Sequence, residues 1–135
     1  MKPNDHVFHV FKKPKKMPPN RVMHGVSTKT NHGAVKKHIP GYNNYENEVK
    51  KGNHKSKLSL GLEETQYVIN RFAGAGKYYP NSRKEVINCK VKIGEWYDDF
   101  TESYLPTSYA TIHFSSKGTH LVPAKPKYLR SPEER

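Results

Sequence analysis

The stretch from Tyr109 to Pro123 constrains the fold of this chain most strongly, because two strand-like segments flank a Lys117-Gly118 turn. Gly118 tolerates a positive φ, so we expect a tight hairpin loop at these two residues. Closing the loop there gives three pairs across the hairpin: Ser115 with His120, Phe114 with Leu121, and His113 with Val122. A four-residue loop would keep the same residues on each face, whereas a three-residue loop would not.

Alternation along the two strands divides the hairpin into an apolar face and a polar face. The apolar face carries Ile112, Phe114 and Leu121, which we expect in the core. The polar face carries groups that hydrogen bond or move protons: Tyr109, Thr111, His113, Ser115 and His120. In this register the two histidines are diagonal neighbours, with Cβ atoms about 7–8 Å apart or less. Such a gap could hold a phosphate; the alternative is a solvated polar face of an ordinary hairpin.

The charge of the chain points to a polyanionic partner. The sequence has 135 residues, enough for one domain with a core, and carries 24 basic against 12 acidic residues for a net charge of +12. Nucleic acid is the simplest partner, and an anionic membrane surface is weaker because no long amphipathic helix carries the charge. Neither a transmembrane run nor a signal-peptide core is present in the sequence, so we expect no membrane insertion. Cys89 is the only cysteine, which excludes an intramolecular disulfide and indicates a buried thiol.

Composition divides the chain into three parts. Residues 1–35 are expected to form a basic extension or linker, because the run Lys-Lys-Pro-Lys-Lys-Met-Pro-Pro at 12–19 cannot continue a helix or a central strand. Order is expected to begin near Lys36, with a domain over residues 36–128. Residues 129–135 read as a polar tail.

The domain is expected to be a small α+β fold. Apolar residues recur at helical spacing from Gly61 to Ala73, and glycines follow them, so this segment predicts a helix. The segment from Lys84 to Ile93 alternates and predicts a half-buried strand. Glu85 has the apolar parity but stands at the strand's start, where it could be exposed, paired with Arg83, or facing the site. The prediction is an N-terminal loop and helix segment followed by a small antiparallel β-sheet, with a helix on one face and the histidines on the open face.

Several short motifs, taken together, resemble a known family. They are Lys37-His38-Ile39-Pro40-Gly41, Lys55-Ser56-x-Leu58, Ala73-Gly74-x-Gly76, Lys84-Glu85-Val86, Ile93-Gly94, Pro106-Thr107 and the block from Ile112 to Ala124. Their order and spacing resemble the polymorphic toxin type 50 domain over roughly residues 36 to 127, and the last block is the most specific. One departure is Phe114, where family members usually have Tyr.

The resemblance implies a fold, an activity and a set of site residues. Members are predicted ribonuclease toxins found at the C-termini of larger secreted effectors and of phage head-morphogenesis-like proteins. Their fold is thought to be similar to the barnase, EndoU, colicin and RelE nucleases, with the active site on an open sheet face. The family signature carries six residues of this sequence as catalytic candidates: His38, Lys55, Ser56, His113, Ser115 and His120.

The leading hypothesis is a metal-independent ribonuclease that cleaves RNA through attack of the ribose 2′-OH, giving a 2′,3′-cyclic phosphate. This reaction needs a base, an acid and positive charge at the phosphoryl oxygens. His113 and His120 would supply the base and the acid in either order, with His38 as a third candidate. Lys55 and Lys117 would stabilise the phosphorane charge, while Ser56 and Ser115 would orient the phosphate or an imidazole. The substrate-binding candidates are Lys117, Thr111, Tyr109, Arg83 and Glu85. We expect no metal and no other cofactor.

Two other functions remain open on the sequence. The charge equally supports a non-catalytic nucleic-acid-binding module of a phage or mobile element. A metal-dependent hydrolase using His38, His113 and His120 is less favoured, because acidic ligands are sparse near these histidines. The expected partners are RNA, with tRNA as one candidate, and an acidic immunity protein. The toxin would act in the bacterial cytoplasm after delivery by secretion or in a phage particle.

Overall fold

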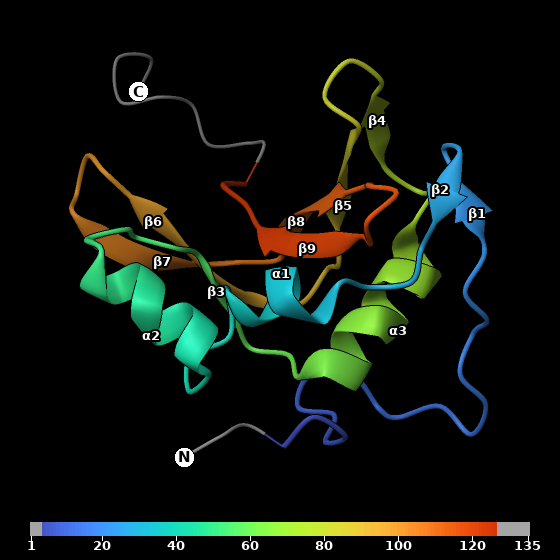
Figure 1. Cartoon of the computed structure of the whole chain (residues 1–135), viewed down its shortest axis with the longest axis horizontal. Coiled ribbons are helices and arrows are strands. Elements are labelled where there is room, and N and C mark those ends of the chain that lie inside the picture. The colour runs from blue at the N-terminus through green and yellow to red at the C-terminus, as the bar shows by residue number, and fades with distance from the viewer. Residues whose placement is uncertain (1–3, 127–135) are drawn as a thin grey trace.

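The computed structural model describes residues 4–126 and has the α+β architecture that the sequence predicts (Figure 1). The helices in these residues are α1 (His32–Lys36), α2 (Asn43–Lys50) and α3 (Leu62–Phe72). The strands are β1 (Val22–Met23), β2 (Val26–Ser27), β3 (Lys57–Leu58), β4 (Lys77–Tyr79), β5 (Lys84–Asn88), β6 (Gly94–Asp98), β7 (Ser103–Thr107), β8 (Tyr109–His113) and β9 (His120–Pro123).

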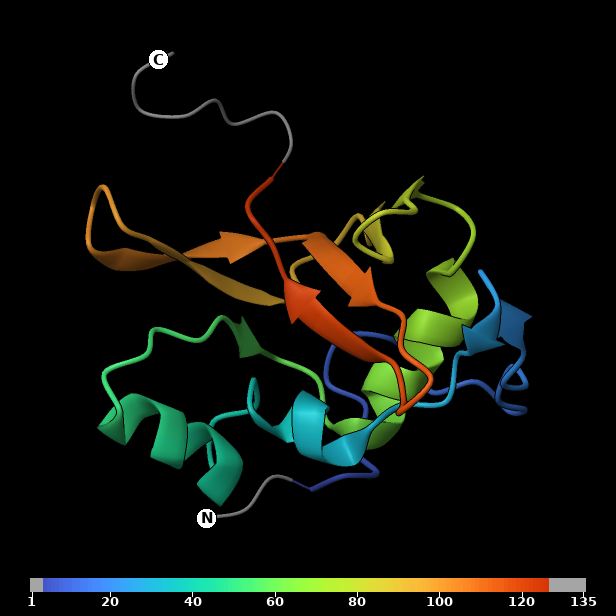
Figure 2. The ribbon, with the colours of Figure 1, turned by 45° about the horizontal axis from the view of Figure 1, so that its top comes forward.

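The central element is a four-stranded antiparallel sheet with the order β4-β5-β8-β9. One face is apolar and packs into the core with α3, through Ile87, Ile112 and Leu121 against Val68 and Ile69. Burying each of these side chains stabilises the fold by about 1.5–3 kcal/mol. Figures 1 and 2 show α1 and α3 beside β9. The side chains of the opposite face are only half-buried, which leaves the open face that the sequence predicts.

The hairpin formed by β8 and β9 differs from its predicted register by two residues. His113 pairs with His120 and Ile112 with Leu121, so the predicted position of the turn is wrong: it is centred on Ser116 and Lys117 instead of Lys117 and Gly118. The Gly118 amide donates to the Ser115 carbonyl (3.0 Å), and the Lys117 amide donates to the Ser115 hydroxyl (3.2 Å). These two bonds stabilise the turn from Ser115 to Gly118, in which Gly118 has a φ of +115°. The division into an apolar and a polar face is confirmed.

Helix α3 confirms the helix predicted between Gly61 and Ala73. Gly61 is its N-cap and Ala73 its C-cap, and Leu62, Val68 and Ile69 on one side are buried. The C-terminal carbonyls of a helix lack partners within the helix. Here the guanidinium of Arg21 donates to the carbonyls of Asn70 (2.5 Å) and Ala73 (2.7 Å).

The strand predicted from Lys84 to Ile93 is too long, because β5 ends at Asn88. The Asn88 side-chain oxygen accepts the Lys90 amide (2.9 Å), and Lys90 has a φ of +65°, so the chain leaves the sheet in a turn. Val91, which lies within the predicted strand, is 44% exposed. Gly94 begins β6 rather than ending the previous strand. Strands β6 and β7 form a second sheet with β3, in the order β3-β6-β7.

Residues 4–35 pack against the domain, although we expected an extension or linker before the ordered part. The buried carboxylate of Glu64 in α3 accepts the backbone amides of His9, Val10 and Phe11 at 2.7–2.9 Å. Figure 1 shows this segment running along α3 before it reaches β1 and β2. The predicted polar tail at 129–135 lies outside the described residues.

Candidate active site on the open sheet face

The two hairpin histidines face each other directly across β8 and β9. Their ring centroids are 4.6 Å apart, with the ring planes inclined by 32°. The expectation of diagonal neighbours is wrong, because the turn lies one residue earlier than predicted and His120 therefore pairs directly with His113. Directly paired residues share a face, so both imidazoles lie on the open side of the sheet. The structure therefore brings the two histidines closer together than the predicted register did.

His38 extends the pair into a row of three histidines. Its ring lies nearly parallel to that of His120, with centroids 6.3 Å apart and an interplanar angle of 13°. The backbone carbonyl of His38 accepts the amide of Leu58 (2.7 Å), and this bond holds the His38 segment beside β3. The Nδ1 atom of His38 is 3.0 Å from the Ser56 carbonyl oxygen and 3.3 Å from the Ser56 hydroxyl. A carbonyl can only accept, so Nδ1 carries a proton and, in the neutral ring, Nε2 has the free lone pair.

Burial and neighbouring cations depress the basicity of all three histidines. Burial, followed by the positive charge of Lys84, lowers the pKa of His113 to about 4. Burial, followed by the charge that His113 and His38 would carry, lowers the pKa of His120 to about 4. Burial also lowers the pKa of His38, against the opposing effect of its hydrogen bond to Ser56. The row is therefore neutral at neutral pH, and an anion bound against it would favour the protonated form.

Lysines surround this histidine row. Lys55 and Lys37 both act on His38 and His120, and Lys84 is the direct cross-strand partner of His113. Lys55 is also 3.6 Å from a carboxylate oxygen of Glu48. The predicted Lys55-Ser56 pair is thus assembled with all three histidines.

The remaining predicted residues fall into three groups. Thr111 and Tyr109 lie on β8 with the parity of His113 and are half-buried. Ser115 and Lys117 lie in the hairpin loop. Arg83 stands just before β5, where its carbonyl accepts the Phe114 amide (3.0 Å), and its side chain is exposed.

Glu85 is not part of the open face. It is fully buried on the core side of β5, and its carboxylate accepts the amides of Gly74 and Gly76 (both 2.8 Å). It also contacts the His24 ring nitrogen at 3.1 Å. The prediction of Glu85 as a substrate-binding residue is therefore wrong. In the sequence, Glu85 falls on the same face of its strand as the apolar residues, and this alternation correctly indicated that it is buried.

Sequence analysis missed two lysines of this site, Lys84 and Lys37. Lys84 shares the outer face of its strand with Val86 and Asn88, and it lies beside His113 because β5 pairs with β8, a pairing that the sequence analysis did not predict. Lys37 gave no signal beyond its position next to His38. Among residues 4–126, no group of three or more His, Cys, Asp or Glu side chains is placed to hold a metal ion. No helix in the described part of the chain is long and apolar enough to cross a membrane.

The fold and this site define a class: a small basic α+β protein with a histidine row on the open face of an antiparallel sheet. The Bacterial toxin 50 family matches residues 30–123, well over half of the chain, so the protein belongs to that family. The match covers His38, the Lys55-Ser56 pair, His113 and His120. No curated protein and no solved structure gave a match.

Proposed function

We propose that this toxin is a metal-independent endoribonuclease whose proton transfers are made by the histidine row. The observation that supports this most is the grouping of His113, His120 and His38, with ring centroids 4.6 and 6.3 Å apart, on an open face flanked by lysines. Two imidazoles can act as the base and the acid of one reaction, and lysines can stabilise the charge that grows on the phosphoryl oxygens.

The proposed reaction is an intramolecular transesterification. One neutral imidazole takes the proton of the ribose 2′-OH as its oxygen attacks phosphorus. The P–O5′ bond breaks, and a protonated imidazole gives its proton to the leaving oxygen, yielding a 2′,3′-cyclic phosphate and a 5′-OH. The low pKa values of about 4 leave both imidazoles unprotonated and free to accept a proton, and a bound phosphate anion would raise the pKa of the second imidazole and favour its acid form. Lys55 and Lys84 would neutralise the phosphorane.

The free Nε2 lone pair of neutral His38 makes it a further candidate for the base. A His38→Ala variant distinguishes two cases. If His38 is catalytic, the substitution should lower kcat with little change in KM. If His38 only positions its neighbour, the substitution should chiefly disturb the pH dependence assigned to His120.

Cleavage assays in EDTA test the proposal. The wild-type protein is incubated with total RNA and with synthetic oligoribonucleotides, beside a His113→Ala/His120→Ala variant. The matched control is His6→Ala/His9→Ala, which removes two exposed histidines of the N-terminal segment. We expect cyclic-phosphate ends with the wild type and the control, and at least about a thousandfold less cleavage with the first variant. Intact RNA in every sample, despite salt-sensitive binding, would instead support a non-catalytic nucleic-acid-binding module.

We also propose that an acidic immunity protein blocks the open face. The support is charge complementarity: the chain carries +12, and Lys37, Lys55 and Lys84 surround the histidines. An acidic protein encoded beside the toxin gene should inhibit the wild type and bind a Lys55→Glu/Lys84→Glu variant at least about tenfold more weakly. Equal binding to both would place the inhibitor elsewhere.

A further inference from the structure

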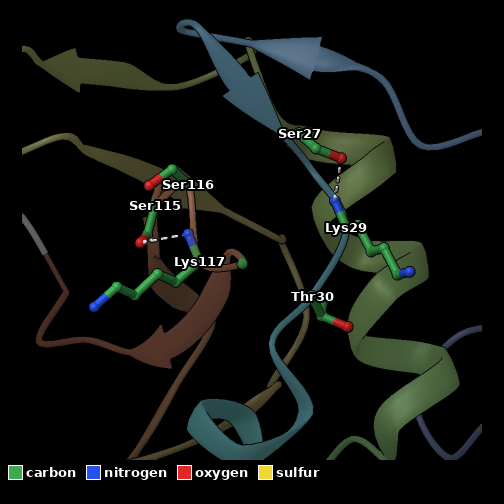
Figure 3. A pocket seen from close by; sticks show the side chains of 7 residues that line it. Ser27, Lys29, Thr30, Ser115, Ser116 and Lys117 are labelled. Carbon is green, nitrogen blue, oxygen red and sulfur yellow. Dashed lines mark hydrogen bonds between the residues drawn. The ribbon is translucent and has the colours of Figure 1, made fainter.

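A polar pocket of about 300 Å³ opens between the β8–β9 loop and the segment at the end of β2 (Figure 3). It is lined by Ser115, Ser116, Lys117 and Gly118 from the loop and by Ser27, Lys29 and Thr30 from the other segment. These residues offer four hydroxyls and two ammonium groups. No Asp or Glu belongs to this lining, so the pocket is electropositive.

The two walls of the pocket are held together by hydrogen bonds. The Thr119 hydroxyl donates to the Ser27 carbonyl (2.8 Å), and the Thr119 amide donates to the Lys29 carbonyl (3.0 Å). The Asn31 amide donates in turn to the Thr119 carbonyl (2.9 Å). Thr119 itself is fully buried. The width of the pocket is therefore set before any ligand enters, which reduces the entropy lost on binding.

The hydroxyls of the pocket are arranged to donate. The Ser27 hydroxyl oxygen accepts the Lys29 amide (3.0 Å), and the Ser115 hydroxyl oxygen accepts the Lys117 amide (3.2 Å). Each O–H is left to donate to a ligand. In Figure 3 the side chains of Lys29 and Lys117 start from opposite walls and extend away from each other. Because phosphate oxygens only accept, a phosphate matches this set of donors.

The pocket and the histidine row share one hairpin. The loop that lines the pocket joins His113 directly to His120, and Ser115 follows His113 by two residues, a span of at most about 7 Å. A strand of RNA bound with one phosphate against the histidine row could place a neighbouring phosphate near the loop. Lys117 belongs to this pocket, and the cations that act on the histidines are Lys37, Lys55 and Lys84.

Building on the ribonuclease function proposed above, we propose that this pocket is a second phosphate subsite, which binds the RNA phosphate adjacent to the one that is cleaved. The subsite would make the enzyme prefer RNA chains over dinucleotides. It would also give the N-terminal segment, which supplies Ser27 and Lys29, a part in substrate binding.

Binding to an inactive background tests the subsite independently of catalysis. The His113→Ala/His120→Ala protein is titrated with di- and tetraribonucleotides over a range of KCl concentrations, with and without Lys29→Gln/Lys117→Gln. Both lysines are exposed, so the fold should tolerate the change, which thermal unfolding checks. The control is Lys12→Gln/Lys16→Gln, which removes the same charge from exposed positions of the N-terminal segment.

We expect the Lys29→Gln/Lys117→Gln change to weaken tetranucleotide binding about tenfold and to lower the salt slope by about 0.7 for the lost phosphate contact. Dinucleotide binding and the control should change less than about twofold. An equal loss in the control, or an equal loss for the dinucleotide, would overturn the subsite. Should wild-type protein cleave no RNA while the tetranucleotide effect persists, the ribonuclease proposal fails and the phosphate pocket stands.

Discussion

At the scale of single residues, hydrogen bonds and burial set the protonation state of the histidine row. Ser56 fixes the Nδ1 proton of His38, and burial keeps His113 and His120 neutral at physiological pH. Neutral imidazoles close together in a positive surrounding form a site that becomes protonated when an anion arrives. A phosphate ligand and a proton should therefore bind cooperatively to this row.

The first prediction concerns this coupling. In NMR titrations of the free protein, the Cε1 protons of His113 and His120 should report pKa values near 4. Saturating inorganic phosphate should raise at least one of them by about one unit or more, because the anion stabilises the imidazolium. Values unaffected by phosphate at both hairpin histidines would contradict the coupling.

The second prediction is a loss of stability in acid that these histidines cause. Their pKa values are lower in the folded protein than the ordinary value of 6.5, so their contribution to stability is complete above about pH 6.5 and is lost as the pH falls toward 4. Urea unfolding should show a decrease of about 1 kcal/mol per histidine between pH 6.5 and 5. In a His113→Asn/His120→Asn variant this part of the decrease should disappear; an identical pH dependence would refute the assignment.

At the scale of elements, the N-terminal segment is attached to α3 through Glu64. Its buried carboxylate accepts three backbone amides, from His9, Val10 and Phe11, and an amide side chain could not replace both oxygens as acceptors. The neighbouring Glu63 makes only partly exposed ion pairs, with His6 and Lys13. The two adjacent acids thus have different energetic roles.

The third prediction uses this difference. Glu64→Gln should lower the free energy of unfolding by about 2–4 kcal/mol, because it leaves buried amides without an acceptor. It should also speed tryptic cleavage after Lys12. Glu63→Gln is the matched control and should cost less than about 1 kcal/mol. Similar losses for the two variants would show that the segment is not held by Glu64.

What the sequence could predict at this scale depends on the range of the interactions. Alternation in β8 and β9 is local, so it correctly separated Ile112 and Leu121 from His113 and His120. The register was wrong because a hydrogen bond to the Ser115 hydroxyl decides the loop. The packing of residues 4–35 depends on backbone amides meeting Glu64, which no side-chain pattern reveals. His38 came only from the family resemblance, because its place in the row depends on Ser56 and Leu58, far along the chain.

At the scale of the whole molecule, the net charge of +12 and the histidine row would make separable contributions to the toxicity expected of this family. The charge alone gives salt-sensitive binding to any nucleic acid, without regard to sequence. The histidines are needed for toxicity only if the protein acts by cleaving RNA. Removing His113 and His120 leaves the formal charge at +12, because both are counted as neutral, so the charge contribution can be tested by itself.

The fourth prediction follows from that separation. Induced expression of the wild-type chain in bacteria should lower the viable count at least about tenfold and fragment cellular RNA, because catalysis destroys many molecules for each toxin made. Expression of His113→Ala/His120→Ala to the same level should leave growth and RNA intact. Colony counts and electrophoresis of total RNA measure both. Equal toxicity from the two proteins would assign the harm to binding, since the variant retains the charge and loses only the groups that transfer protons.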